Sequence, residues 1–271
     1  MWLLYGEKKL IGERMDLPKN NFKKALKAGT HQIGIWNSIA GNSVPELLAT
    51  CGFDWVLIDT EHAPVETVEI QSSLHSISAY ENVSAVVRPA GNDPILIKRI
   101  LDMGALTLLL PYIQTAQEAK DAVSYVTYGP NGMRGMAGMT RATRYGTVEN
   151  YFKKASEEIC LLVQVETVQA IDQLEAIALT PGIDGVFIGP ADLSASMGYP
   201  GEINHPEVVK VIMDAISKLK SLNIPSGILT LDFDSAKRYI SAGTTFTAVG
   251  VDMVLLAEST RNLRRQFDKN L

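Results

Sequence analysis

Short apolar runs alternate along the chain with longer segments whose apolar residues recur at helical spacing. Apolar runs of about four to eight residues, bounded by Gly or polar residues, are typical of buried strands. On this basis we predict eight strands, at residues 32–38, 55–59, 84–88, 106–110, 161–165, 185–189, 226–229 and 246–250.

The segments between these runs predict helices. Asp93-Pro94 and Thr115 are typical helix starts. The predicted helices cover residues 44–51, 115–128, 167–179, 206–222, 234–242 and 257–267, with two more that begin at Pro64 and Pro94. Residues 1–20 are weakly patterned and form a predicted N-terminal extension. Residues 129–150, rich in Gly, Met and Arg, are too long for an ordinary connection and are predicted to be functional or part of an interface.

Strands that alternate with helices indicate a parallel sheet covered by helices. About eight such units over roughly 250 residues is the count of a closed barrel. We therefore assign the chain to the α/β class, with residues 21–271 forming a single (β/α)8 TIM barrel. An open doubly wound sheet is the alternative, but no Gly-x-Gly-x-x-Gly fingerprint follows the first strand.

Composition narrows the range of partners. The 271 residues are 46% hydrophobic and 20% charged, with a net charge of −5 and no basic run, which argues against nucleic acid or an anionic membrane as partner. No apolar window approaches the roughly 18 residues of a membrane span, and charges interrupt the N-terminus where a signal peptide is apolar. Cys51 and Cys160 are predicted to be buried free thiols. We expect a soluble cytoplasmic protein.

Polar side chains stand where the predicted strands end. A barrel places its chemistry at the C-terminal ends of its strands. The residues found there are Asp59 with His62, Arg88, Gln164 with Glu166, and Asp192.

Glu166 and Asp192 predict a metal site. They end neighbouring predicted strands, which lie about 4.8 Å apart in a sheet. Two carboxylates without a ligating His or Cys favour a hard cation such as Mg²⁺ or Mn²⁺, with water and substrate completing the coordination. In the alternative, Glu166 caps the next helix and Asp192 makes a turn hydrogen bond.

His62 and Arg88 complete the predicted chemistry. Histidine is a natural general base near neutral pH, and the nearby Asp59 would fix its tautomer. Arg88 ends an apolar strand and would bind a substrate carboxylate or a developing enolate. The alternative is an internal ion pair of Arg88 with Asp59 or Glu61. The remaining histidines, His31, His75 and His205, are interpreted as structural.

Two reaction classes are disfavoured. None of the predicted strands contains the lysine that a Schiff-base aldolase needs, and only weak phosphate-binding loops follow strands seven and eight. Metal-assisted chemistry on a small oxygen-rich acid remains, in which a cation stabilises the enolate of a 2-oxo acid.

Several motifs also carry a family resemblance. The segments 53–64, 87–89, 92–94, 162–166, 185–193 and 249–252 resemble, in this order, the HpcH/HpaI aldolases, which are metal-dependent pyruvate aldolases. Thr60 stands where Gly is common in this family, and the N-terminal extension has no counterpart.

The resemblance implies a role for each candidate residue. Glu166 and Asp192 bind the metal, His62 is the base supported by Asp59, and Arg88 stabilises the transition state. Asp102 raises the basicity of the histidine, which fits a contact across subunits. The substrate-binding residues implied for the pyruvate moiety are Gln164, Gly189, Pro190 and Ala191.

The implied activity is reversible cleavage of a 4-hydroxy-2-oxo acid, such as a hydroxy-oxo-dioate or keto-deoxy sugar acid, to pyruvate and an aldehyde through a metal-stabilised enolate. The implied cofactor is Mg²⁺ or Mn²⁺, with Co²⁺ as a further candidate. Family members form hexamers, trimers of dimers, that exchange the last helix. In them the segment that corresponds to residues 132–139 reaches a neighbouring subunit's pocket. The alternative is that this Met-rich segment packs at an interface without touching substrate. Lyase or decarboxylase chemistry on a related acid, or a non-catalytic barrel that binds an oxo acid, are the alternative functions.

Overall fold

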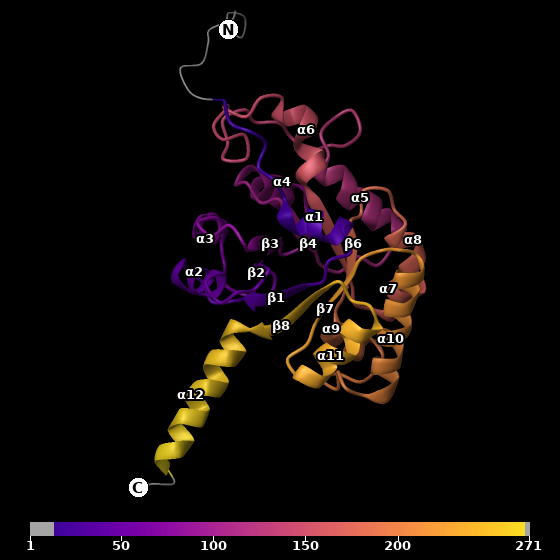
Figure 1. The fold of residues 1–271 in the computed structure, drawn as a ribbon. Helices are drawn as coiled ribbons and strands as arrows, with labels where there is room; N and C mark the ends of the chain where they lie inside the picture. The colour runs from indigo at the N-terminus through magenta and orange to yellow at the C-terminus, as the bar shows by residue number, and fades with distance from the viewer. Residues whose placement is uncertain (1–13, 269–271) are drawn as a thin grey trace, which may run out of the picture.

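Eight parallel strands close into a barrel in their sequence order. The structure is a computed structural model that describes residues 14–268 (Figure 1). Each strand pairs with the next, and β1 pairs with β8 to close the ring. The strands are β1 Gln32–Asn37, β2 Trp55–Asp59, β3 Ser84–Arg88, β4 Thr107–Leu110, β5 Cys160–Val165, β6 Gly185–Ile188, β7 Ser226–Leu229 and β8 Phe246–Val251. The predicted barrel is confirmed, and its strand boundaries agree closely with the observed ones.

Helices surround the barrel. They are α1 Asn21–Lys27, α2 Ser43–Ala49, α3 Thr67–Ile77, α4 Pro94–Asp102, α5 Ala116–Val126, α6 Tyr151–Glu158, α7 Val168–Asp172, α8 Leu174–Ala178, α9 Pro190–Ser196, α10 Pro206–Ser221, α11 Phe233–Ala242 and α12 Asp252–Asp268. Thr115 and Asp93 cap α5 and α4, as predicted.

The structure differs from the prediction at several helices. The helices α1, α6 and α9 were not predicted, because segments of seven or eight residues carry little helical periodicity. The predicted helix 167–179 is the pair α7 and α8, which meet at Gln173. Helix α3 begins at Thr67 rather than Pro64, because Glu66 and Glu69 form a capping box. Helix α12 begins at Asp252, directly after β8, rather than at Ala257.

Aromatic side chains fill the inside of the barrel. Trp36, Trp55, Phe187 and Phe246 from four strands pack there with mostly edge-to-face or tilted contacts. Phe22 from α1 is fully buried against Trp55 and Phe246. A second apolar cluster fills the space between strands and helices. Because the interior is packed, a substrate has room only at an end of the barrel.

The segment before α1 follows the barrel surface. Asn20 is 4% exposed, caps α1 and donates from Nδ2 to Thr107 Oγ1 at 2.9 Å. Residues 1–13 of the predicted extension lie outside the described residues, and the division at residue 20 stays a prediction.

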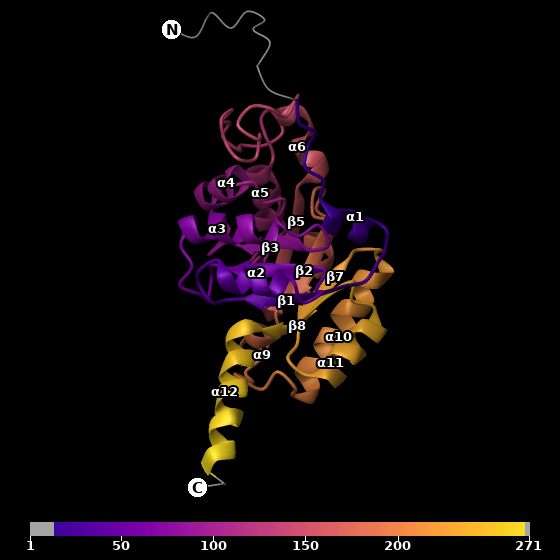
Figure 2. The same ribbon diagram turned by 60° about the vertical axis from the view of Figure 1, so that its left-hand side comes forward.

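Helix α12 extends away from the barrel in both views (Figures 1 and 2). Five of its large apolar side chains are about half exposed. Leu255 is one of them, at 49%, and the other four are spaced three to seven residues apart: Met253 49%, Leu256 54%, Leu263 57% and Phe267 57%. This spacing places the four side chains in one apolar stripe along the helix.

Two sequence predictions concern the rest of the molecule. Cys160 is a buried free thiol, as predicted, whereas Cys51 is free but exposed, so the prediction of its burial was wrong. Cys51 follows α2 in a turn, outside the helix that was expected to shelter it. Between residues 14 and 268, the helices lack the length and apolar character needed to cross a membrane.

Candidate active site

The C-terminal ends of β2, β3 and β5 bring four polar side chains together. Asp59 and Arg88 end β2 and β3 and are paired in register. Gln164 lies in β5 and Glu166 follows it directly. All four are buried, at 2%, 6%, 4% and 2% exposed respectively. The barrel therefore assembles the predicted constellation at the expected end.

Arg88 is held by carboxylates on two sides. Its Nε and Nη2 donate to Asp59 at 2.9 and 2.7 Å, and Nη1 lies 2.7 Å from Glu61 Oε2. Nη1 also donates to Gln164 Oε1 at 3.5 Å, and the guanidinium lies 5.1 Å from the centre of the Trp36 ring. The internal ion pair considered as an alternative is thus present.

The pKa of Asp59 reflects this pairing. Burial acts to raise it, but the hydrogen bonds and charge of Arg88, with smaller contributions from the Glu61 N–H and Trp36, lower it overall. Asp59 is therefore an anion that orients Arg88, and Trp36 Nε1 donates to the same carboxylate at 3.3 Å.

Glu166 is a buried carboxyl group without a cationic partner among the described residues. Its Oε1 accepts from the Tyr112 N–H at 2.8 Å, and its Oε2 accepts from Gln164 Nε2. Burial first, and then repulsion from Glu61 and Asp192, raise its pKa to about 7. Glu166 does not cap the next helix, because Thr167 does so through its hydroxyl.

Gly189 makes room for Glu166. A Cβ at this position would lie 2.5 Å from Glu166 Oε2 and 2.9 Å from Gln164 Nε2. Any other residue would displace both side chains. Gly189 also stands at the start of α9, where Pro190, Ala191 and Asp192 form the first turn.

Asp192 completes an acidic group around Glu166. Its side chain is exposed at the start of α9, accepts no hydrogen bond from residues 14–268, and raises the pKa of both Glu166 and Glu61. The turn hydrogen bond considered for it is not formed. A divalent cation would remove this repulsion, so the donor set fits a hard metal ion. In the described part of the chain no three His, Cys, Asp or Glu side chains form a metal cluster, so protein would supply two ligands and solvent or substrate the others.

His62 lies at the edge of this group. Its side chain is 67% exposed, with Nε2 3.9 Å from Glu61 Oε2. It makes no hydrogen bond to Asp59, whose oxygens are taken by Arg88, Trp36 and the Glu61 N–H. Asp59 therefore acts on His62 at most indirectly within one chain.

Asp102 lies at the opposite end of the barrel. It is the last residue of α4, one short turn before β4 begins, and it pairs with Arg134 Nη2 at 3.2 Å. A single chain therefore does not bring Asp102 and His62 together.

The sequence analysis missed two residues that shape the site, Tyr112 and Asp252. Tyr112 has a left-handed φ of 57°, which aims its N–H at Glu166. Asp252 is 6% exposed and accepts hydrogen bonds from Asn37 and from both Ser38 and Ile39 N–H groups at the end of β1. A non-glycine left-handed residue leaves no sequence signal, and Asp252 stood out only as the end of the 249–252 motif.

Comparisons with known proteins agree with this geometry. A model of the HpcH/HpaI aldolase/citrate lyase family matches residues 32–259. A pyruvate aldolase from Rhizobium etli is 54% identical over 253 residues, covering 93% of this chain and 99% of that protein. A 4-hydroxy-2-oxo-heptane-1,7-dioate aldolase from Salmonella dublin is 47% identical over 256 residues, covering 93% and 97%. A solved HpcH/HpaI family structure from Burkholderia cenocepacia has a TM-score of 0.88 and 36% identity, covering 92% of this chain and 100% of that one.

Proposed function

The chain belongs to the HpcH/HpaI aldolase/citrate lyase family, and from this membership we propose that it reversibly cleaves a 4-hydroxy-2-oxo acid to pyruvate and an aldehyde. The observation that carries the proposal is that two buried groups lie at the same barrel end: the guanidinium of Arg88, and the carboxyl group of Glu166, which has no cationic partner among the described residues. Arg88 offers donors to a developing enolate, and Glu166 with Asp192 offers oxygens to a cation.

The metal ligands in this proposal are Glu166 and Asp192. A Mg²⁺ or Mn²⁺ ion held there would act as a Lewis acid toward the oxygens of the 2-oxo acid. The pair matches the ligand preference of these ions, because both groups are carboxylates. Co²⁺ is a further candidate.

The pyruvate moiety is placed by the groups around Glu166. The first turn of a helix has N–H groups without intrahelical partners, so Ala191 at the start of α9 can donate to the substrate carboxylate. Gln164 supplies a further polar contact, and Gly189 with Pro190 keeps this backbone close to the acid.

The bond cleavage is assigned to Arg88 and His62. His62 takes the proton of the C4 hydroxyl, the C3–C4 bond breaks, and the aldehyde forms at C4. The bonding electrons move to the C2 carbonyl and give an enolate, whose charge Arg88 stabilises. Protonation at C3 then gives pyruvate. Asp59 and Glu61 hold the guanidinium in place for this step.

We also propose assembly into a hexamer. The apolar stripe of α12 would pack on a neighbouring subunit, and a neighbour is needed if Asp102 is to influence a histidine. The exposed side chains of Met133, Met136 and Met139, at 61%, 63% and 75%, suit contact with a neighbour's pocket. Two free thiols support a reducing compartment, the cytoplasm.

The test is pyruvate release from a panel of 4-hydroxy-2-oxo acids. The protein is treated with chelator and assayed before and after addition of Mg²⁺ or Mn²⁺. We expect activity that disappears with chelation and returns with the ion. Release indifferent to the ion would contradict the metal assignment, and no release from any acid would contradict the aldolase assignment. Pyruvate binding without turnover would instead identify a non-catalytic barrel.

A further inference from the structure

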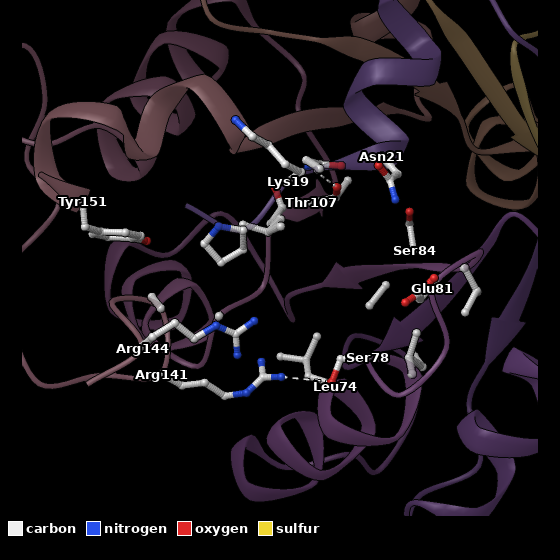
Figure 3. A pocket seen from close by; sticks show the side chains of 18 residues that line it. Lys19, Asn21, Leu74, Ser78, Glu81, Ser84, Thr107, Arg141, Arg144 and Tyr151 are labelled. Carbon is white, nitrogen blue, oxygen red and sulfur yellow. Dashed lines mark hydrogen bonds between the residues drawn. The ribbon is translucent and has the colours of Figure 1, made fainter. Parts of the chain in front are cut away.

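A hollow lies at the barrel end opposite the active site. It is a cavity of about 210 Å³ between the end of α3, the starts of β3 and β4, and the segments around residues 18–21 and 141–144 (Figure 3). Ser84 and Thr107, the first residues of β3 and β4, line it. Because the aromatic side chains fill the barrel interior, this cavity does not communicate with the active site through the barrel.

Two arginines face this cavity, and neither pairs with a carboxylate among residues 14–268. Arg141 donates to neutral acceptors, the Met103 carbonyl at 2.9 Å and Ser78 Oγ at 3.2 Å. The guanidinium of Arg144 makes no hydrogen bond or ion pair with residues 14–268 in the structure. Both guanidinium groups point into the hollow (Figure 3). Burial first, and then the charge of Arg144, lower the pKa of Arg141.

The remaining charges around the cavity do not balance this pair. Lys19 directs its amino group to Glu158 at 2.8 Å, so its charge is already paired. Glu81 is the single acidic residue among the described lining residues. The hydroxyl of Tyr151 and the side-chain amide of Asn21 add neutral polar groups on other sides (Figure 3).

The backbone holds the arginines in this arrangement. Gly104 has a φ of +90°, which favours glycine, and a Cβ there would lie 2.8 Å from Arg141 Nη1, so a side chain at this position would displace the guanidinium. Arg144 itself has a left-handed φ of 49°. Such conformations cost energy at non-glycine residues and persist where the surroundings fix them.

We propose that this cavity binds a small anion through a phosphate or carboxylate group, with Arg141 and Arg144 as the charged donors. Planar guanidinium groups suit both kinds of anion, because each can donate two parallel hydrogen bonds. An anion between them would also relieve the repulsion of two like charges. Within one chain the cavity is separate from the groups assigned to the aldolase reaction, and the proposal does not depend on that reaction.

Isothermal titration calorimetry tests the proposal with two probes, inorganic phosphate and succinate. Each is titrated at constant ionic strength into the full chain in the presence of saturating pyruvate and Mg²⁺. We expect at least one probe to bind with a dissociation constant of roughly 1 mM or lower. The tighter probe identifies the ligand as a phosphate or a carboxylate compound.

Variants locate the binding. Arg144→Gln should weaken the tighter probe by about tenfold or more, whereas Glu81→Gln should strengthen it. Arg99→Gln, which changes an exposed arginine on α4 outside the cavity, is the matched control and should leave binding unchanged. If Arg144→Gln unfolds, the opposite effect of Glu81→Gln still decides. The proposal fails if neither probe binds the wild-type chain, if Arg144→Gln and Glu81→Gln both leave binding unchanged, or if pyruvate displaces the probe.

Discussion

The fold disfavours ionisation of the Glu166 carboxyl group, so its titration affects the free energy of unfolding. Its pKa is raised from 4.5 to about 7 by burial and by neighbouring carboxylates. A raised folded-state pKa means that the contribution to stability is complete below pH 4.5 and is lost as the pH rises through about 7. The cation-free protein should therefore become less stable across this interval.

We expect Glu166→Gln to stabilise the chelator-treated protein at pH 8 by about 2–3 kcal/mol. The glutamine oxygen can still accept the Tyr112 N–H, but it carries no charge to bury. Urea unfolding at pH 4.5 and pH 8 measures the effect, and the two proteins should converge at the lower pH. Asp192→Asn, at an exposed site, is the control and should change stability far less. A variant less stable than wild type at pH 8 would contradict the argument. In the same variant, metal-dependent pyruvate release should be lost.

Replacement of Arg88, even by another cation, should lower the catalytic rate. Lysine lacks the fork that donates to both oxygens of Asp59, so Arg88→Lys should lower kcat at least about 100-fold, the scale of losing one donor to a developing oxyanion. Arg88→Ala should also destabilise the fold by about 3–5 kcal/mol, since Asp59 and Glu61 lose their shared partner. Steady-state kinetics and urea unfolding check the two parts. Near-normal kcat in the lysine variant would remove Arg88 from the reaction.

At this scale the sequence predicted which residue types gather, but not how they pair. Strand periodicity placed Asp59, Arg88, Gln164 and Glu166 at one rim, because parallel strands end together. It left open whether Arg88 faces an anion or Asp59, since that depends on side-chain geometry. The left-handed backbone of Tyr112 had no sequence signal at all.

Among the elements, the junction of β8 and α12 controls the loop that follows β1. The Asp252 carboxylate accepts from Asn37 Nδ2 at 2.7 Å and from the Ser38 and Ile39 N–H groups at 2.9 and 3.0 Å. This loop begins two residues after Trp36, which donates to Asp59. Asp252 therefore fixes one wall of the mouth without lying among the reacting groups.

Asp252→Ala should loosen this wall. We expect the KM for the aldehyde in the addition direction to rise by about tenfold, because the loop is no longer held in place in advance and must be ordered when the aldehyde binds. Exchange of the pyruvate C3 protons should change little. The matched control is Asp232→Ala, which removes a cap from α11 but no contact with the β1 loop. Equal effects of both variants would mean that general rim stability, rather than this loop, is responsible.

The long helices were predictable, whereas several short ones were not. The helix α10 has enough turns for its apolar face to be visible in the sequence. Helices α1 and α9, of seven residues each, form because the barrel packs against them, so their signal is tertiary. The early start of α12 depends on Asp252, which is the first residue of the helix and also accepts hydrogen bonds from the end of β1.

At the scale of the whole molecule, the apolar stripe of α12 has no partner among residues 14–268. Replacing Leu256 and Leu263 by Asp should dissociate the proposed hexamer, because each leucine buried there would contribute about 1.5–3 kcal/mol and charges would enter the interface. Val68→Asp, at a side chain 77% exposed on α3, is the control. Size-exclusion chromatography with light scattering measures the mass. An unchanged mass in the double variant would exclude the α12 stripe from the interface.

Aromatic side chains close the barrel at the end opposite the active site, so the active site has a single opening. Phe22 and the rings above it leave no exit through the centre, so substrate must enter, and both products must leave, past the same rim. In the proposed reaction the pyruvate half would be held against the buried Glu166, and the aldehyde half would lie outward of it. We therefore expect the aldehyde to depart first and pyruvate last, so that pyruvate is the product that binds the free enzyme.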